Sequence, residues 1–267
     1  MIRASHLNCA SFCPVGWSWA GAGTQGLVCH CLLLETEQGL ILIDTGFGTQ
    51  VIERREALIG HSLTRLGRPA FDPAETALAQ IKALGYSQAD VRHIVCTHLD
   101  PDHAGGLSDF PHAQVHVYSS ELAEAISPRW SQRPRYRSEL WSPDTRWVTH
   151  QESGERWHGF EAVRDLPGLP PEILLIPLLG HSAGHCGVAV DVGDHWLLHC
   201  GDAYFHSGEL NDPPYCPTAL RVSQRLLAVD NEARLHNQAK LRALSLDAQA
   251  QVALFCAHDL SEFERHT

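Results

Sequence analysis

Short apolar runs that end at a polar residue recur along the chain and alternate with amphipathic stretches. Each run has the length of a strand, and several end at glycine, aspartate or histidine, which is typical of strands that lead into turns. The predicted strands are residues 27–36 (LVCHCLLLET), 39–48, 91–98 (VRHIVCTH), 115–118, 172–181, a hairpin over 188–202, and 252–258.

Three stretches between these strands have a helical pattern. Residues 72–85 (DPAETALAQIKALG) begin with Asp72 as a cap and Pro73 at the first helical position, and Glu75 is placed to complete a capping box. The other predicted helices are residues 119–126 and 218–244. Because strands and helices alternate in both halves, we expect two sheets covered by helices, with polar residues at the strand ends.

Composition limits the kinds of protein that this chain represents. Its 267 residues suit a single domain over 1–267, and 44% of them are hydrophobic, enough for a sizeable core. The net charge of −11 argues against a nucleic-acid-binding surface. The apolar runs are too short to span a membrane, and the first residues lack a signal-peptide pattern, so we expect a cytoplasmic protein with no membrane partner. The nine cysteines are interpreted as buried free thiols.

Residues 128–160 differ in composition from the rest of the chain. They contain four of the seven tryptophans and a group of arginines that includes Arg133, Arg135 and Arg137. We interpret this stretch as an ordered insertion, because it is too aromatic for a disordered linker. It has three candidate uses: to cover a site and contact an anionic small substrate, to form a homodimer contact, or only to pack against the domain.

The stretch THLDPDHAGG at 97–106 concentrates potential metal ligands. His98, Asp100, Asp102 and His103 fall within six positions, just after a predicted buried strand. Imidazole nitrogens and carboxylate oxygens bind zinc or iron at about 2.0–2.2 Å, and a two-metal centre gathers such ligands from several elements. Three more predicted ligands stand at or after other strand ends: His181, Asp202 and His258.

These motifs together resemble the metallo-β-lactamase-fold hydrolase superfamily, in its lactonase and glyoxalase II-like branch. They are IDTG at 43–46, THLDPDHAGG at 97–106, GHSAGH at 180–185, GD at 201–202 and the terminal His258, in the order that the family has them. The resemblance implies an α/β fold, a four-layer αββα sandwich with two mixed sheets flanked by helices. It also implies a dinuclear metal site at one edge of the sheets.

The resemblance further implies a role for each ligand. His98, Asp100 and His181 would bind the first metal, Asp102, His103 and His258 the second, and Asp202 would bridge them. Asp44 would orient the loop without being a ligand. The family usually has histidine at the position of Asp100. Two zinc ions remain the first expectation, and this carboxylate makes iron or manganese an alternative. The other interpretation is that Asp100 turns away and hydrogen-bonds the loop.

The predicted reaction is hydrolysis of an ester-like bond in a small molecule, a lactone first, by a hydroxide that bridges the two metals. Asp102 would hold and orient the hydroxide, and Tyr204 would polarise the substrate carbonyl unless it only packs at the rim. His185 would stabilise its loop or contact substrate. An iron-dependent oxidoreductase, either persulfide dioxygenase-like or di-iron, is the alternative, and a non-catalytic ligand-binding protein is a third class.

Overall fold

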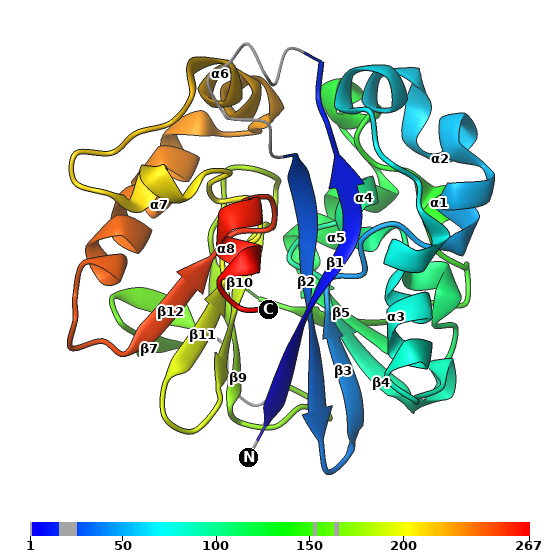
Figure 1. The fold of residues 1–267 in the computed structure, drawn as a ribbon, viewed down its shortest axis with the longest axis horizontal. Helices are drawn as coiled ribbons and strands as arrows, with labels where there is room; N and C mark the ends of the chain where they lie inside the picture. The colour runs from blue at the N-terminus through cyan, green and yellow to red at the C-terminus, as the bar shows by residue number, and fades with distance from the viewer. Residues whose placement is uncertain (1, 16–25, 152–153, 163–165) are drawn as a thin grey trace.

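The fold consists of two sheets that lie face to face between two layers of helices (Figure 1). It is seen in a computed structural model that describes residues 2–15, 26–151, 154–162 and 166–267. Figure 1 shows helices α1, α2 and α3 on the right of the sheets and helices α6 and α7 on the left. This arrangement is the αββα sandwich that the sequence predicts.

The first sheet has six strands in the order of the sequence. They are β1 (Arg3–Phe12), β2 (Leu27–Thr36), β3 (Gly39–Ile43), β4 (Val91–Val95), β5 (Gln114–Tyr118) and β6 (Arg146–His150). The pairs β1–β2 and β2–β3 are antiparallel, and β3 to β6 are parallel, so the sheet is mixed. Since β2 runs against β3, the start of β2 lies at the same edge as the end of β3.

The second sheet has four strands in the order β12-β11-β10-β9. Their bounds are β9 (Ile173–Pro177), β10 (Cys186–Asp191), β11 (Trp196–His199) and β12 (Val252–Phe255). This sheet is mixed as well, because β11 pairs with β12 in parallel and with β10 in antiparallel. A separate hairpin joins β7 (Glu155–Trp157) to β8 (Phe160–Ala162).

Alternate residues of the strands pack on opposite faces of each sheet. Leu32, Ile43 and Val95 of the first sheet form a buried cluster with Leu175 and Val188 of the second. Their neighbours in the sequence point outward, toward the helices, because side chains alternate along a strand. The strands are therefore apolar on both faces, which explains why their sequences are nearly continuous apolar runs.

Helices cover the outer face of each sheet. The bounds are α1 (Thr49–Glu53), α2 (Arg55–Ser62), α3 (Ala77–Ala83), α4 (Pro101–Ala104), α5 (Ser119–Ile126), α6 (Thr218–Leu227), α7 (Asn231–Ser245) and α8 (Leu260–Glu264). Val51 of α1 and Ile81 of α3 pack on the first sheet, and Leu241 of α7 packs on the second. Among the described residues, none of these helices is both long and apolar enough to cross a membrane.

Two predicted elements differ from the structure. The expected helix 72–85 is a 3-10 turn at Pro73–Glu75 followed by α3. The Thr76 side chain accepts from the backbone of Ala79 and so caps a new helix that begins at Ala77. Glu75 forms no capping box, since its carboxylate accepts hydrogen bonds from the backbone and hydroxyl of Ser11. The predicted helix 218–244 is likewise divided into α6 and α7, where Asp230 caps α7.

The stretch 128–160 is only in part an excursion from the fold. Residues 146–150 form β6, the edge strand that extends the first sheet beside β5. The segment before β6 contains two short 3-10 turns, Trp130–Gln132 and Ser138–Leu140. It carries Arg135 into contact with the candidate site described next.

Candidate metal centre

The predicted ligands gather where strands of both sheets end. His98 follows β4, Asp202 follows β11, and His258 follows β12, while His181 stands on the loop between β9 and β10. Asp102 and His103 lie on α4, the short helix that follows the loop after β4. Asp100 is the N-cap residue of this helix. Strands fixed by two packed sheets hold their ends rigidly, so ligands from distant parts of the sequence reach one place.

The first group of donors surrounds one point. His98, His181 and Asp202 each offer a ligand atom within 4.8 Å of the others. His181 Nε2 lies 3.3 Å from Asp202 Oδ2, and His98 Nε2 lies 3.8 Å from the same oxygen. Asp100 Oδ2 is 3.4 Å from His98 Nε2 and 3.2 Å from His181 Nε2. An ion bound tetrahedrally at about 2.0–2.2 Å holds its ligands roughly 3.3–3.6 Å apart, so these separations fit one.

Asp100 divides its two oxygens between the donor group and an arginine. Its Oδ2 faces the two histidines, while its Oδ1 lies 2.9 Å from Nε of Arg135. The Arg135 guanidinium also donates to the carbonyl oxygens of His181 and Leu227, both at 2.8 Å. One Asp100 oxygen thus faces the two histidines and the other faces Arg135, and ligation by Asp100 stays a prediction.

The second group of donors shares Asp202 with the first. His103, Asp202 and His258 offer ligand atoms within 4.8 Å of one another. Asp202 Oδ1 lies 3.2 Å from His103 Nε2 and 3.1 Å from His258 Nε2. Asp102 Oδ2 lies 3.7 Å from His258 Nε2 and 4.0 Å from His103 Nε2. Because Oδ1 of Asp202 faces this group and Oδ2 faces the first, the carboxylate is placed to bridge two ions.

Several of these buried atoms lack the hydrogen-bond partner that buried polar atoms ordinarily have. Within the part of the chain that the structure describes, His98 Nε2, His103 Nε2 and Asp202 Oδ1 have none. The Nδ1 atom of His103 is 2.8 Å from an Asp44 oxygen, and that of His258 is 2.8 Å from the carbonyl oxygen of Val28. Each Nδ1 donates there, which leaves the Nε2 lone pairs directed at the centre. The donor set therefore fits a pair of divalent cations.

Charge within the cluster is balanced between carboxylates and imidazoles. Burial opposes ionisation of Asp202, but His258, His103 and His181 around it hold the pKa of its carboxyl well below the ordinary value. Burial also opposes protonation of His103, yet Asp202, Asp44 and Asp102 raise the pKa of its imidazole well above the usual value. The cluster is thus built to hold negative charge beside cationic groups.

Two residues outside the donor groups fix the central loop. Asp44 accepts from the backbone and the hydroxyl of Thr97, at 2.8 and 2.7 Å, in addition to its contact with His103. Asp44 has a φ of 56°, in the left-handed region that aspartate tolerates better than most residues. The structure therefore supports the orienting role that the resemblance implies for Asp44.

Glu121 is a residue that the sequence interpretation missed. Its carboxylate, fully buried on α5, accepts hydrogen bonds from the backbone of Leu99, between the ligands His98 and Asp100, and from Ser182 and Gly184, just after His181. The only sequence signal was an acidic residue in the first turn of an otherwise ordinary helix, which is also common on helix surfaces.

Tyr204 and His185, for which substrate contact was one of two interpretations, both have protein partners in the structure. The Tyr204 side chain is fully buried, and its hydroxyl lies 3.1 and 3.2 Å from the two oxygens of Glu262. This placement favours packing over the polarising role suggested for Tyr204. His185 accepts at Nε2 from the backbone of Asp202 and lies 2.8 Å from the carbonyl oxygen of Leu178 through Nδ1, so it stabilises the loops that carry the ligands.

Comparison with known proteins agrees with this geometry. A family model described as the metallo-beta-lactamase superfamily matches residues 24–250. The chain is 41% identical over 261 residues to the probable metallo-hydrolase Rv2300c of Mycobacterium tuberculosis, covering 97% of this chain and 80% of that protein. The N-acyl homoserine lactonase of Bacillus cereus is 27% identical over 168 residues, covering 63% of this chain and 60% of the lactonase.

Solved structures share the fold. An N-acyl homoserine lactone hydrolase with its product N-hexanoyl-L-homoserine at the catalytic metal centre has a TM-score of 0.72 at 22% identity, covering 98% of this chain and 95% of that one. The dizinc quorum-quenching lactonase AidC has a TM-score of 0.62 at 16% identity, covering 96% of this chain and 87% of that one. These likenesses confirm the predicted fold class. The chain belongs to the metallo-beta-lactamase superfamily.

Proposed function

We propose that this protein is a dinuclear metal-dependent hydrolase that cleaves an ester-like bond of a small molecule, with a lactone as the first substrate class. The observation that carries the proposal is the pair of buried donor groups that share Asp202, one oxygen to each group. A single structural ion would need only one such group. Two adjacent metal ions are typical of hydrolytic centres.

Divalent cations held by these donors supply Lewis acidity and bring the pKa of water close to neutrality. The chain itself contributes position and charge. Asp202 fixes the two donor groups relative to each other, and the Asp44–His103 contact fixes the α4 end of the second group. The low exposure of the histidines excludes water from most of the cluster, which strengthens electrostatic contacts there.

Asp102 is the member of the cluster that faces outward most. Its side chain is 17% exposed, whereas those of His103 and His258 are 2% and 5% exposed. One of its oxygens can therefore stay with the second donor group while the carboxylate also contacts a water or substrate at the open side. We assign to Asp102 the orientation of the attacking water and the transfer of its proton.

Two observations support lactones as the substrate class: the names of similar proteins and the paired donor groups of the candidate metal centre. Proteins named N-acyl homoserine lactonase are similar to this chain in sequence, and lactonases share its fold. Cations held by the donor groups would polarise the carbonyl of a lactone, and its ring oxygen would leave as part of the same molecule. The proposal assigns no catalytic role to Tyr204, because its hydroxyl is held by Glu262.

The test combines metal analysis with a substrate panel. Protein purified without added metal is analysed for zinc, iron and manganese, and is then assayed on lactones, thioesters, β-lactams and phosphodiesters. We expect about two metal ions per chain and turnover of at least one lactone. Asp102→Asn should lower kcat on that lactone by roughly 100-fold or more, while Asp109→Asn, on the loop after α4, should leave it nearly unchanged. Absence of lactone turnover by metal-loaded protein would contradict the substrate class.

A further inference from the structure

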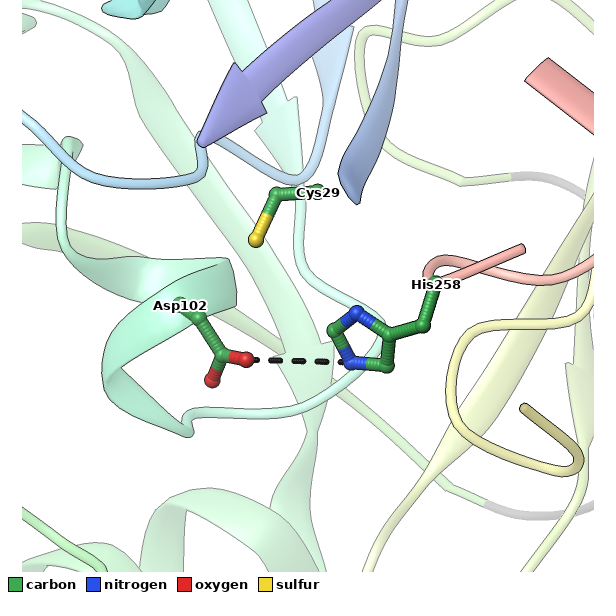
Figure 2. Close-up of side chains that lie close together, drawn as sticks. All are labelled: Cys29, Asp102 and His258. Atoms are coloured by element: carbon green, nitrogen blue, oxygen red, sulfur yellow. Dashed lines mark ion pairs between the residues drawn. The ribbon is translucent and has the colours of Figure 1, made fainter. Parts of the chain in front are cut away.

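A cysteine lies beside the second donor group. Cys29 Sγ, a carboxylate oxygen of Asp102 and a ring nitrogen of His258 are all within 4.8 Å of one another. Figure 2 shows the Cys29 sulfur directed toward Asp102 and His258, with the three side chains arriving from different elements. Cys29 is on β2, whose start lies at the edge of the first sheet where β3 and β4 end.

The backbone of β2 fixes Cys29 and His258 relative to each other. The carbonyl oxygen of Val28 accepts from Nδ1 of His258, and the backbone N–H of His30 donates to the carbonyl oxygen of Ala257 at 2.9 Å. The residues on either side of Cys29 are thus tied to the segment that carries His258. The backbone N–H of Cys29 also donates to the Asn8 side chain. The thiol therefore has a defined place beside this ligand.

Among the described residues, the second donor group contains buried polar atoms that have no hydrogen-bond partner. Cys29 is 1% exposed, and the buried atoms His103 Nε2 and Asp202 Oδ1 of the second donor group have no hydrogen-bond partner among the described residues. These unpartnered atoms are independent of the cysteine, and Asp202 Oδ1 is 3.1 Å from Nε2 of the same His258 that Cys29 approaches. The group that contains Cys29 and the second donor group share His258, so the sulfur lies beside one member of the second group.

We propose that Cys29, as a thiolate, binds the metal ion held by Asp102, His103, Asp202 and His258. The inference rests on the proposed dinuclear centre. On metal binding, the sulfur–hydrogen bond breaks, the proton goes to solvent, and the sulfur electron pair forms the bond to the ion, so no oxidant or reductant is needed. The two positions of the centre then differ: Asp100 makes the first position harder, and the thiolate makes the second position softer.

Cys31 provides the matched comparison. It lies two residues further along β2, on the same face of the strand, and is buried to the same degree, but no donor group includes it among the described residues. If Cys29 were only a buried packing residue, the two cysteines would behave alike on metal binding. If Cys29 is a ligand, only its removal changes the spectrum of the metal centre.

The experiment is a titration of metal-free protein with cobalt(II), followed by absorption spectroscopy. Wild-type protein that has bound two cobalt ions should show the intense near-ultraviolet sulfur-to-cobalt charge-transfer band in addition to the weaker visible bands. Cys29→Ala should lose the charge-transfer band and keep visible bands from the first position, whereas Cys31→Ala should keep both. Binding two ions to Cys29→Ala should also release about one proton fewer per chain than binding them to wild type.

A second measurement needs no variant, so it stands even if Cys29→Ala does not fold. X-ray absorption of the wild-type dizinc protein should require a sulfur neighbour at about 2.3 Å, on average one for every two zinc ions. Two bound metals without a sulfur shell and without the charge-transfer band would overturn the role of Cys29 and leave the proposed function intact. Failure to bind metal at all would overturn both.

Discussion

Glu121 connects the loop that carries His98 and Asp100 with the loop that carries His181. Its Oε1 accepts from the backbone of Leu99 at 3.0 Å and from the hydroxyl of Tyr136 at 3.1 Å. Its Oε2 accepts from the hydroxyl of Ser182 at 2.7 Å and from the backbone of Gly184 at 2.8 Å. All four partners are donors, so only a group with two acceptor oxygens satisfies them together.

The perturbation is Glu121→Gln, which keeps the shape and replaces one oxygen by an amide NH₂. That NH₂ then faces two donors, and two hydrogen bonds to a charged acceptor are lost. Each is worth roughly 1.5–3 kcal/mol, so we expect the free energy of unfolding to fall by about 3–6 kcal/mol. Metal affinity should fall about 10- to 100-fold, because the loops that present His98 and His181 lose their common anchor.

Both quantities are measurable. Urea unfolding of the metal-free protein gives the free energy of unfolding, and competition with a chromophoric chelator gives metal affinity. Glu124→Gln is the control, since Glu124 lies one turn further on α5 and pairs with Arg129 at 3.0 Å near the surface, where loss of the pair should cost less than about 1 kcal/mol. Equal effects of the two variants, or an unchanged metal affinity in Glu121→Gln, would refute the anchoring role.

Three further predictions concern other buried polar groups. Arg135→Gln should lower the unfolding free energy of metal-free protein by about 3 kcal/mol, because it leaves Asp100 without its guanidinium partner; the exposed Arg133→Gln serves as control, and similar losses in both would argue against the pair. Tyr204→Phe should cost about 1 kcal/mol of stability and leave kcat within about threefold, so a fall of roughly 100-fold or more would restore a catalytic role. Burial raises the pKa of Glu262 from 4.5 to about 7, so the folded state holds this proton more tightly than the unfolded chain does. Its contribution to stability is full below about pH 4.5 and is lost as pH rises through 7, by up to about 3 kcal/mol. Chemical unfolding from pH 4 to 8 should show this slope reduced in Glu262→Gln, and an unchanged slope would contradict the assignment.

The linear pattern of residues was enough to predict most strands and the types of ligand. Apolar runs reveal strands that are buried on both faces, and a polar residue after such a run indicates a strand end at the sheet edge. This reasoning singled out His98, His181, Asp202 and His258, which the structure brings together. It missed β1 (Arg3–Phe12), because that edge strand mixes polar and apolar residues without a continuous buried run.

Predictions from spacing along the chain were wrong or incomplete where a side chain forms its hydrogen bonds with a residue far away in the sequence. Glu75 had the spacing of a capping box, but its carboxylate accepts from Ser11, 64 residues away in the sequence. Tyr204 is only two residues from Asp202 in the sequence, yet its hydroxyl donates to Glu262. Hydrogen-bond partners are set by packing, so spacing along the chain predicts them only when the partners belong to one element.

The sequence by itself determined most of the strands, which of their faces are apolar and which residue types stand at the strand ends. Only the tertiary structure decided that Asp100 shares its oxygens between two histidines and Arg135, that Glu121 joins two loops, and that Cys29 approaches His258. The physical reason is that periodicity reports how a residue is buried, whereas its contacts depend on how the two sheets dock. Residues 29, 102 and 258 meet because β2 starts where β4 and β12 end, an arrangement that no local pattern records.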